Sequence, residues 1–122
     1  MLGRRSALWG VGSALAFPAY GQEMFPDRPV RIVIGFAAGG PTDIVMRRIA
    51  ERMSAILGRP IIVENKTGAT GTIAATEVAR SRPDGYTLLV AVSSSHAIAA
   101  NTMARPGFHP VDDCAGIGIL CI

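Results

Sequence analysis

The residues most able to do chemistry lie in the segment IVIGFAAGGPTD, residues 32–43. Gly39 and Gly40 lack a Cβ atom, so a ligand could approach their backbone N–H groups closely. A helix expected to begin at Thr42 or Asp43 would add partial positive charge at the same point. Exposed amides beside the start of a helix suit an anion. The segment therefore predicts an anion-binding turn, with a tight strand-to-helix turn that binds nothing as the alternative.

The acidic residue of this segment leaves the kind of ligand open. The Asp43 carboxylate would repel a carboxylate ligand unless its charge caps the helix or water separates the two groups. Equally, it could face a hydroxyl or an ammonium group of a ligand. The sequence alone does not choose between these interpretations.

Phosphate cofactors fit the segment poorly. Residues 35–40 are followed by Pro41 and Thr42, whereas a P-loop would place a lysine there. The dinucleotide fingerprint GxGxxG is absent, and Gly68–Gly71, with the sequence GATG, keeps only part of its spacing. We therefore expect no cofactor, and a fragment of a nucleotide-dependent enzyme is the weaker alternative.

Catalysis and metal binding also have little support. Ser93–Ser95 beside His96 are residue types of a catalytic triad, but no GxSxG elbow is present. Cys114 and Cys121 have neither CxxC nor zinc-ligand spacing, and we expect them to be small apolar side chains on a strand. The sequence thus predicts neither an enzyme nor a metal site.

Hydrophobic patterning predicts the elements that position these residues. Apolar runs typical of buried strands occupy residues 30–36, 61–64 and 87–92. Helical spacing of apolar residues covers residues 42–57 and 72–81. Strands that alternate with helices imply parallel pairing, so we expect an α/β sheet. In such sheets ligands bind at the carboxyl ends of the strands, which here are residues 37–43, 65–72 and 93–96.

The ends and faces of the longer helix can also be predicted. Thr42 is expected to cap it, with Asp43 in the first turn, and Gly58 is expected to end it. Its apolar side is expected to combine two neighbouring rows of residues: Val45, Ile49, Met53 and Ile56, with Met46, Ala50 and Leu57 beside them. The turn at Arg82–Tyr86 is expected to use Gly85 at positive φ.

Composition describes one globular domain and argues against a nucleic-acid partner. The 122 residues are 49% hydrophobic and 17% charged. The formal charge is +3, but residues 22–122 contain ten basic and nine acidic residues, a net charge of +1. Aromatic residues are few and the arginines are scattered, so we expect no polyanion to bind.

The amino-terminal residues 1–21 have the pattern of a signal peptide. Arg4 and Arg5 precede the apolar stretch 7–16, and small residues surround Ala19 and Gly21. The stretch is too short for a relaxed membrane span. We therefore expect export to the periplasm and a mature lobe over residues 22–122, with a buried amino-terminal helix as the alternative. The arginine pair leaves the Sec and twin-arginine routes undecided.

Five ordered motifs give the chain a resemblance to a known family. They are FPDRPVRIVIGF, GGPTD, LGRPIIVEN, GATGTIAA and PDGYTLL, within residues 25–98. With these motifs the chain resembles the amino-terminal part of the Bug family, the extracytoplasmic solute receptors of tripartite tricarboxylate transporters. The resemblance implies a periplasmic binding protein of two α/β lobes that closes over a small organic acid. It also implies that the receptor hands this carboxylate ligand to the membrane components of the transporter and is not an enzyme.

The resemblance also implies which residues hold the ligand. In the family, the loop after the first strand helps to hold a carboxylate through backbone N–H groups and bridging water. Carried onto this chain, the three loops place the following residues at the site: Gly39, Gly40, Pro41, Thr42, Asp43, Asn65, Gly68, Ala69, Thr70, Gly71, Ser94, Ser95 and His96.

The chain departs from the family pattern in two places and in its length. Ala99 and Ala100 stand where members commonly have Asn-Pro, and Cys114 follows Asp113 where DFAP is usual. The sequence ends at Ile122, near the point where a member would pass into its second lobe. We therefore expect an incomplete first lobe, a truncated receptor that binds weakly. A small α/β interaction module without solute binding, or an inactive receptor fragment, is the alternative.

Overall fold

A parallel three-stranded sheet forms the centre of the protein. The computed structural model describes residues 24–120, so the expected signal peptide and Cys121 lie outside the described residues. The strands are β1 (Val30–Ile34), β2 (Ile61–Asn65) and β3 (Thr87–Val90), in the order β2-β1-β3. Both neighbours of β1 run parallel to it, with Ile32 opposite Val63 and Leu88. The predicted parallel α/β sheet is confirmed.

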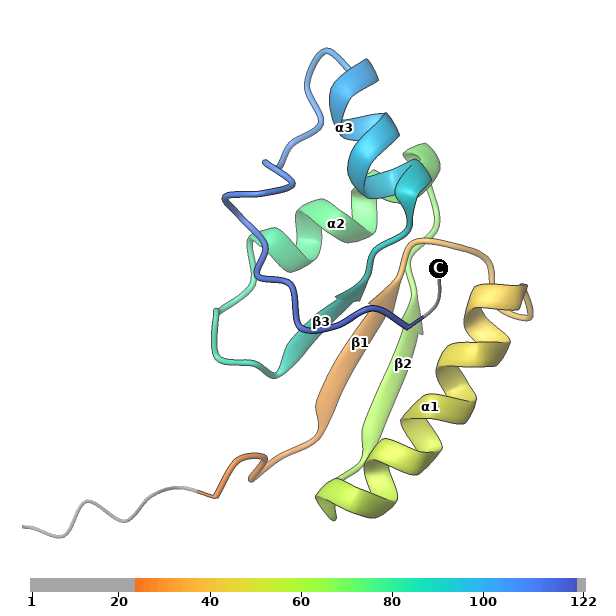
Figure 1. The fold of residues 1–122 in the computed structure, drawn as a ribbon, viewed down its shortest axis with the longest axis vertical. Coiled ribbons are helices and arrows are strands. Elements are labelled where there is room, and N and C mark those ends of the chain that lie inside the picture. Colours follow the sequence, from red (N-terminus) through yellow and green to blue (C-terminus); the bar gives the residue numbers. More distant parts are fainter. Residues whose placement is uncertain (1–23, 121–122) are drawn as a thin grey trace, which may run out of the picture.

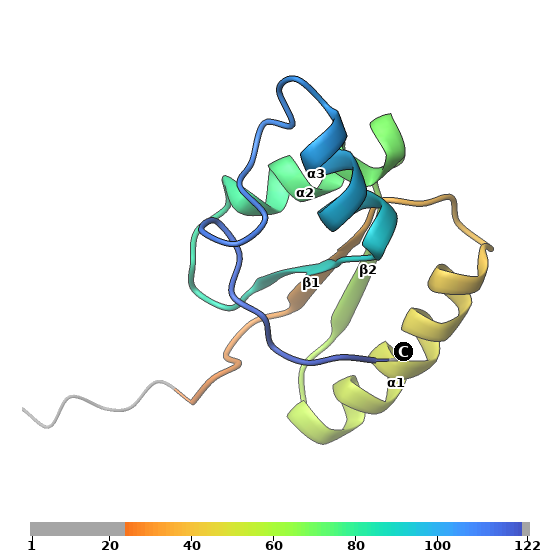
Figure 2. The ribbon, with the colours of Figure 1, turned by 45° about the horizontal axis from the view of Figure 1, so that its top comes forward.

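Two helices cover opposite faces of this sheet (Figures 1 and 2). The connection after β1 contains α1 (Pro41–Leu57), and the connection after β2 contains α2 (Thr72–Ala79). A short π-helical turn, Ser94–Ile98, and α3 (Ala99–Thr102) follow β3. Because the chain leaves β1 toward one face and β2 toward the other, the carboxyl end of β1 lies at a topological switch point. That position is where open α/β sheets bind ligands.

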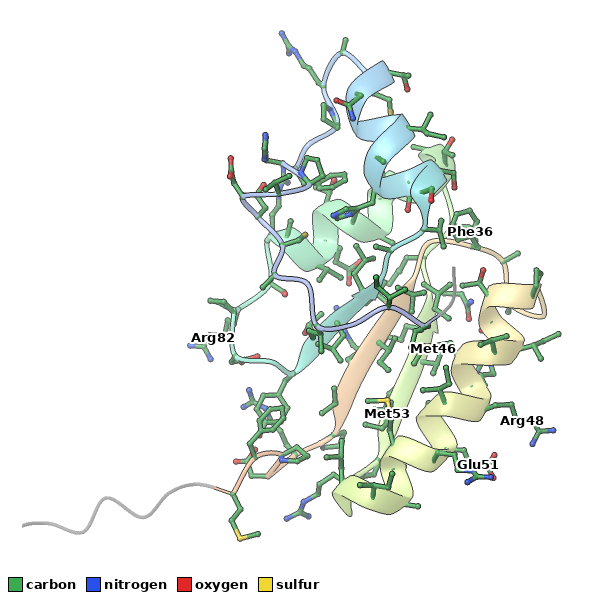
Figure 3. The ribbon with its side chains drawn as sticks, viewed as in Figure 1. Phe36, Met46, Arg48, Glu51, Met53 and Arg82 are labelled. Carbon is green, nitrogen blue, oxygen red and sulfur yellow. The ribbon has the colours of Figure 1, made fainter. Side chains whose placement is uncertain are left out.

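The main hydrophobic core lies between α1 and the sheet. Ile32, Ile34 and Met46 are almost fully buried and form its centre. Figure 3 shows Met46 and Met53 directed toward the sheet, whereas Arg48 and Glu51 point away from it. Around the centre pack further half-buried residues: Phe36, Ile49, Met53, Ile61, Val63, Leu88 and Val90.

The α1 helix begins earlier and faces the core more narrowly than predicted. Gly40 is its N-cap residue and Pro41 occupies the first turn, so the prediction that Thr42 caps it is wrong. Proline has no N–H to leave unpaired and its φ suits the first helical position. Val45 and Ile56 are 51% and 82% exposed, whereas Ile49 and Met53, which lie between them in the same row, pack against the core. Gly58 ends the helix at φ +67, as predicted.

Ion pairs help to attach α2 to the other face of the sheet. Arg31 Nη2 lies 2.7 Å from Glu77 Oε1 and Arg31 Nη1 lies 3.4 Å from Glu64 Oε2. Lys66 Nζ lies 3.5 Å from Glu77 Oε2. The fully buried Val33 lies on the same face as Arg31, since alternate residues of a strand share a face.

An aromatic cluster fixes the segment before β1. Phe25 and Tyr86 have ring centroids 5.0 Å apart, and the guanidinium of Arg28 lies 4.1 Å from the Tyr86 centroid. Arg28 also pairs with Asp84 at 2.8 Å. These contacts hold residues 25–28 against the turn before β3, where Gly85 has the predicted positive φ. They lie at the end of the sheet opposite to the three loops that follow the strands.

Candidate functional site

The loop after β1 is held by the carboxylate of its own aspartate. Asp43 is 3% exposed, and its Oδ2 accepts a hydrogen bond from the Gly39 N–H at 2.9 Å. The Gly40 N–H donates to Ala37 O at 3.3 Å. The expectation that both glycine amides are uncovered is therefore wrong. Asp43 lies four residues after Gly39, and its short side chain folds back onto the loop to reach that amide.

Two further side chains complete the surroundings of this carboxylate. Arg47 Nε donates to Asp43 Oδ2 at 2.9 Å, and Asn65 Nδ2 donates to Asp43 Oδ1 at 3.0 Å. Asn65 also donates to Phe36 O and accepts from Arg47 Nη2, each at 3.0 Å. Sequence reasoning missed Arg47, although acidic and basic residues four positions apart on a helix are a known pairing signal.

These hydrogen bonds stabilise the charged form of Asp43. They lower its pKa from 3.8 to about 2, with the bond from Arg47 as the largest cause and the Gly39 amide second. Desolvation acts in the opposite direction and is outweighed. The carboxylate is therefore ionised at neutral pH, and both of its oxygens already accept hydrogen bonds from the protein.

The depressed pKa predicts a specific loss of stability in acid. A pKa that is lower in the folded state contributes stability above the unfolded value, and this contribution is lost as the pH falls through the folded value. For Asp43 the loss should occur between about pH 4 and pH 2. Urea unfolding at several pH values in this window measures it. The Asp43→Asn variant is the control, since Asp27, whose pKa is also lowered, titrates in both proteins. If the free energies of unfolding of the two proteins changed equally with pH in this window, the prediction would be wrong.

The loop after β2 has an unusual backbone. Ala69 and Thr70 have φ values of +44 and +56. Glycine takes such values readily, but a β-branched residue rarely does. Residues Ala69–Gly71 form a single 3-10 turn, and the Gly71 N–H donates to Gly68 O at 2.9 Å. Strained residues of this kind cluster at ligand-binding sites, and the turn leaves the side chain of Thr70 exposed.

The predicted site residues of the loop after β3 have two different roles. Ser95 is 3% exposed, and its Oγ donates to Val92 O at 3.1 Å. His96 Nε2 lies 2.8 Å from Pro110 O, and its ring lies 5.5 Å from that of Phe108. Both side chains therefore hold the chain after β3 in place. Ser94 remains half-buried, at the start of a π-helical turn, which is a feature often found at functional sites.

The three loops meet through positions that have room only for glycine. A Cβ atom on Gly35 would lie 2.7 Å from Gly71 Cα, and one on Gly71 would lie 2.8 Å from Ser95 Cβ. The end of β1, the loop after β2 and the turn after β3 are thus in direct contact. Sequence reasoning placed Gly71 and Ser95 at the site but missed Gly35, the residue that lets the first loop approach the second.

Several donors remain free in the three loops and in the first turn of α1. The N–H groups of Thr42 and Asp43 lie in the first turn of α1 and have no acceptor among residues 24–120. The hydroxyls of Thr42, Thr70 and Ser94 likewise make no hydrogen bond within the described part of the chain. The first turn of a helix carries partial positive charge, so the amides of Thr42 and Asp43 can receive an anion, and the free hydroxyls can bond to a polar ligand.

The hollows described by the structure lie away from the free donors. Two shallow hollows of about 380 and 390 Å³ occur elsewhere in the described residues: one beside α2 includes Thr76 and Met103, and one beside α1 includes Arg47 and Ser54. Neither hollow is lined by Thr42, Thr70 or Ser94.

Other kinds of site find no support in the described residues. Among residues 24–120 no cluster of potential metal ligands occurs, and no helix is long and apolar enough to cross a membrane. Cys114 is half-buried in an irregular segment, so its predicted place on a strand is wrong.

Comparisons with known proteins identify the family. Residues 45–121 match the family described as tripartite tricarboxylate transporter family receptor. A UPF0065 protein of Cupriavidus necator is 54% identical over 74 residues, which are 60% of this chain and 23% of that protein. The chain spans about a quarter to a third of the length of the curated relatives it matches.

Solved structures give the same result. The periplasmic binding protein BugD is 48% identical with a TM-score of 0.65, over 70% of this chain and 28% of that one. The protein MatC of Rhodopseudomonas palustris, solved with bound malate, is 46% identical with a TM-score of 0.69, over 73% of this chain and 30% of that one. The resemblance read from the sequence motifs is confirmed, and the chain belongs to the family of tripartite tricarboxylate transporter receptors.

Proposed function

We propose that this chain carries one wall of a carboxylate-binding site in an exported solute receptor. The ligand is a small organic acid, and the partners are the membrane components of a tripartite tricarboxylate transporter. The receptor works in the periplasm, to which residues 1–21 direct it as a signal peptide. The chain acts by binding and release and has no catalytic role.

Family membership and two solved relatives support this proposal. The family is one of transporter receptors, BugD is a periplasmic binding protein, and MatC was solved with malate. The observation that carries the proposal for this chain is that three strand-end loops contact one another and that each of them, or the helix turn next to it, has unpaired donors. Those donors are the amides of Thr42 and Asp43 and the hydroxyls of Thr42, Thr70 and Ser94.

The donors define how the acid is recognised. The proposed contacts with the ligand carboxylate are therefore amide and hydroxyl dipoles, while the Nε and Nη2 of Arg47 pair with Asp43 and Asn65. The Asp43 carboxylate opposes the ligand less than an unpaired acid would, because the Arg47 guanidinium lies 2.9 Å from it and its own N–H belongs to the free set.

A carboxylate bound on the open surface of one lobe is held more weakly than one enclosed between two closed lobes. A neutral hydrogen bond contributes about 1 kcal/mol net, and a solvated carboxylate keeps competing water partners. We therefore expect the purified 122-residue chain to bind malate with a dissociation constant of about 1 mM or weaker. In nuclear magnetic resonance titrations, malate should shift the amide resonances of Thr42, Asp43 and Ser94.

Two controls define this test. Malamide, which keeps the shape of malate without its charge, should produce much smaller shifts. The Thr42→Val variant keeps the shape of the side chain, removes one hydroxyl and should weaken malate binding. If malate shifts none of the strand-end resonances, the proposed function is wrong. Micromolar binding would instead contradict the expectation that this part of the site binds weakly on its own.

A further inference from the structure

The side chains around Asp43 form a closed ring between two of the loops. Asp43 bonds to Arg47, Arg47 bonds to Asn65, and Asn65 bonds back to Asp43, at distances of 2.9–3.0 Å. From this ring, one bond leads to the Gly39 N–H and another to Phe36 O. The ring thus ties both ends of the loop after β1 to the last residue of β2.

The polar groups of this ring are directed at each other. Both oxygens of Asp43 accept hydrogen bonds from the protein. The Nδ2 of Asn65 donates to Phe36 O and to Asp43, and its Oδ1 accepts from Arg47. A ligand that displaced one of these bonds would leave an unsatisfied partner in the ring.

We infer that Asp43, Asn65 and Arg47 are positioning residues, which lock the loop after β1 onto β2 and fix the direction of the free amides in the first turn of α1. The ring reassigns the side chains of Asp43 and Asn65, which the family resemblance placed against the ligand, and it adds Arg47 to the site. The inference rests on the proposed function only for the ligand that those amides receive.

The Asn65→Asp variant tests this positioning role, which we call the lock, because aspartate and asparagine have almost the same shape. Its carboxylate cannot donate to Phe36 O or Asp43, and it places a second negative charge beside the first. We expect the amide resonances of Gly39 and Asp43 to move in the ligand-free protein. We also expect malate affinity to fall about tenfold, since hydrogen bonds to a charged group are lost.

Other substitutions separate the lock from a general loss of stability. The double variant Asp43→Asn with Asn65→Asp restores a donor–acceptor pair and should recover part of the affinity. Arg47→Lys keeps the charge but cannot reach both partners with one planar group, so malate binding should weaken. Arg48→Lys is the matched control, because Arg48 is exposed on the adjacent position of α1, and it should change neither property.

The outcomes of these substitutions distinguish positioning of the loop from direct contact with the ligand. If Asn65→Asp lowers affinity but leaves the ligand-free resonances of Gly39 and Asp43 in place, Asn65 contacts the ligand directly and the lock is wrong. If Asn65→Asp does not fold, unchanged resonances of Gly39 and Asp43 in Arg47→Lys would equally overturn the lock. If malate binds nowhere on the wild-type chain, the proposed function fails, while the ligand-free resonances still test the lock.

Discussion

Replacing Gly71 with alanine is expected to lower the free energy of unfolding by about 2–4 kcal/mol, the combined cost of overpacking and of positive φ. Gly71 has φ +88, and the added Cβ would lie 2.8 Å from Ser95 Cβ, where real contacts of this kind do not occur. The turn after β3 must therefore move away from the loop after β2. Chemical unfolding monitored by circular dichroism measures the change.

A second glycine separates the two causes of this loss. Gly39 has φ +82, but an added Cβ there would have no neighbour within 4 Å. Gly39→Ala should therefore cost only the backbone strain, about 1–2 kcal/mol. The difference between the two variants measures the contact between the loops. Equal losses would show that the loops are not packed against each other as described.

Replacing Ile34 with alanine is expected to cost about 2–5 kcal/mol, the range for large-to-small changes in a core. Ile34 is fully buried in the central strand and belongs to the same core cluster as Ile32 and Met46. The substitution leaves a cavity directly below the loop after β1. We expect the chemical unfolding midpoint to fall and the amide resonances of that loop to broaden.

The control for this substitution lies on α1. Ile56 is 82% exposed, so Ile56→Ala should change the free energy of unfolding by no more than about 0.5 kcal/mol. If the two variants lose similar amounts of stability, the core does not lie between the sheet and α1. Measuring both under the same conditions removes errors of extrapolation.

Most of the fold could be predicted because its signals are local. The apolar runs of residues 30–36, 61–64 and 87–92 predicted three strands, and each prediction overlaps an observed strand. Their ends differ by one or two residues, since β1 stops at Ile34 and β3 at Val90. Gly58 and Gly85 predicted backbone turns because few other residues adopt positive φ.

The chemistry of the site was less predictable because it depends on contacts across the sheet. Whether the Gly39 amide is free depends on how Asp43 folds back, and Asp43 is in turn held by Asn65 from another strand. No local pattern reports such a contact. His96 appeared to belong to the site by position, but its ring is bound by a segment that has no regular structure. The i, i+4 spacing of Asp43 and Arg47 was the one local signal that could have indicated the ring.

The mutual contact of Gly35, Gly71 and Ser95 has a consequence for changing ligand preference. The loops contact one another at these positions, so each loop fits only the conformations of the other two. A single strand-end loop transplanted from another receptor would therefore clash with the loops that it contacts. Specificity in this lobe should therefore be exchangeable between receptors as a set of three segments rather than one at a time.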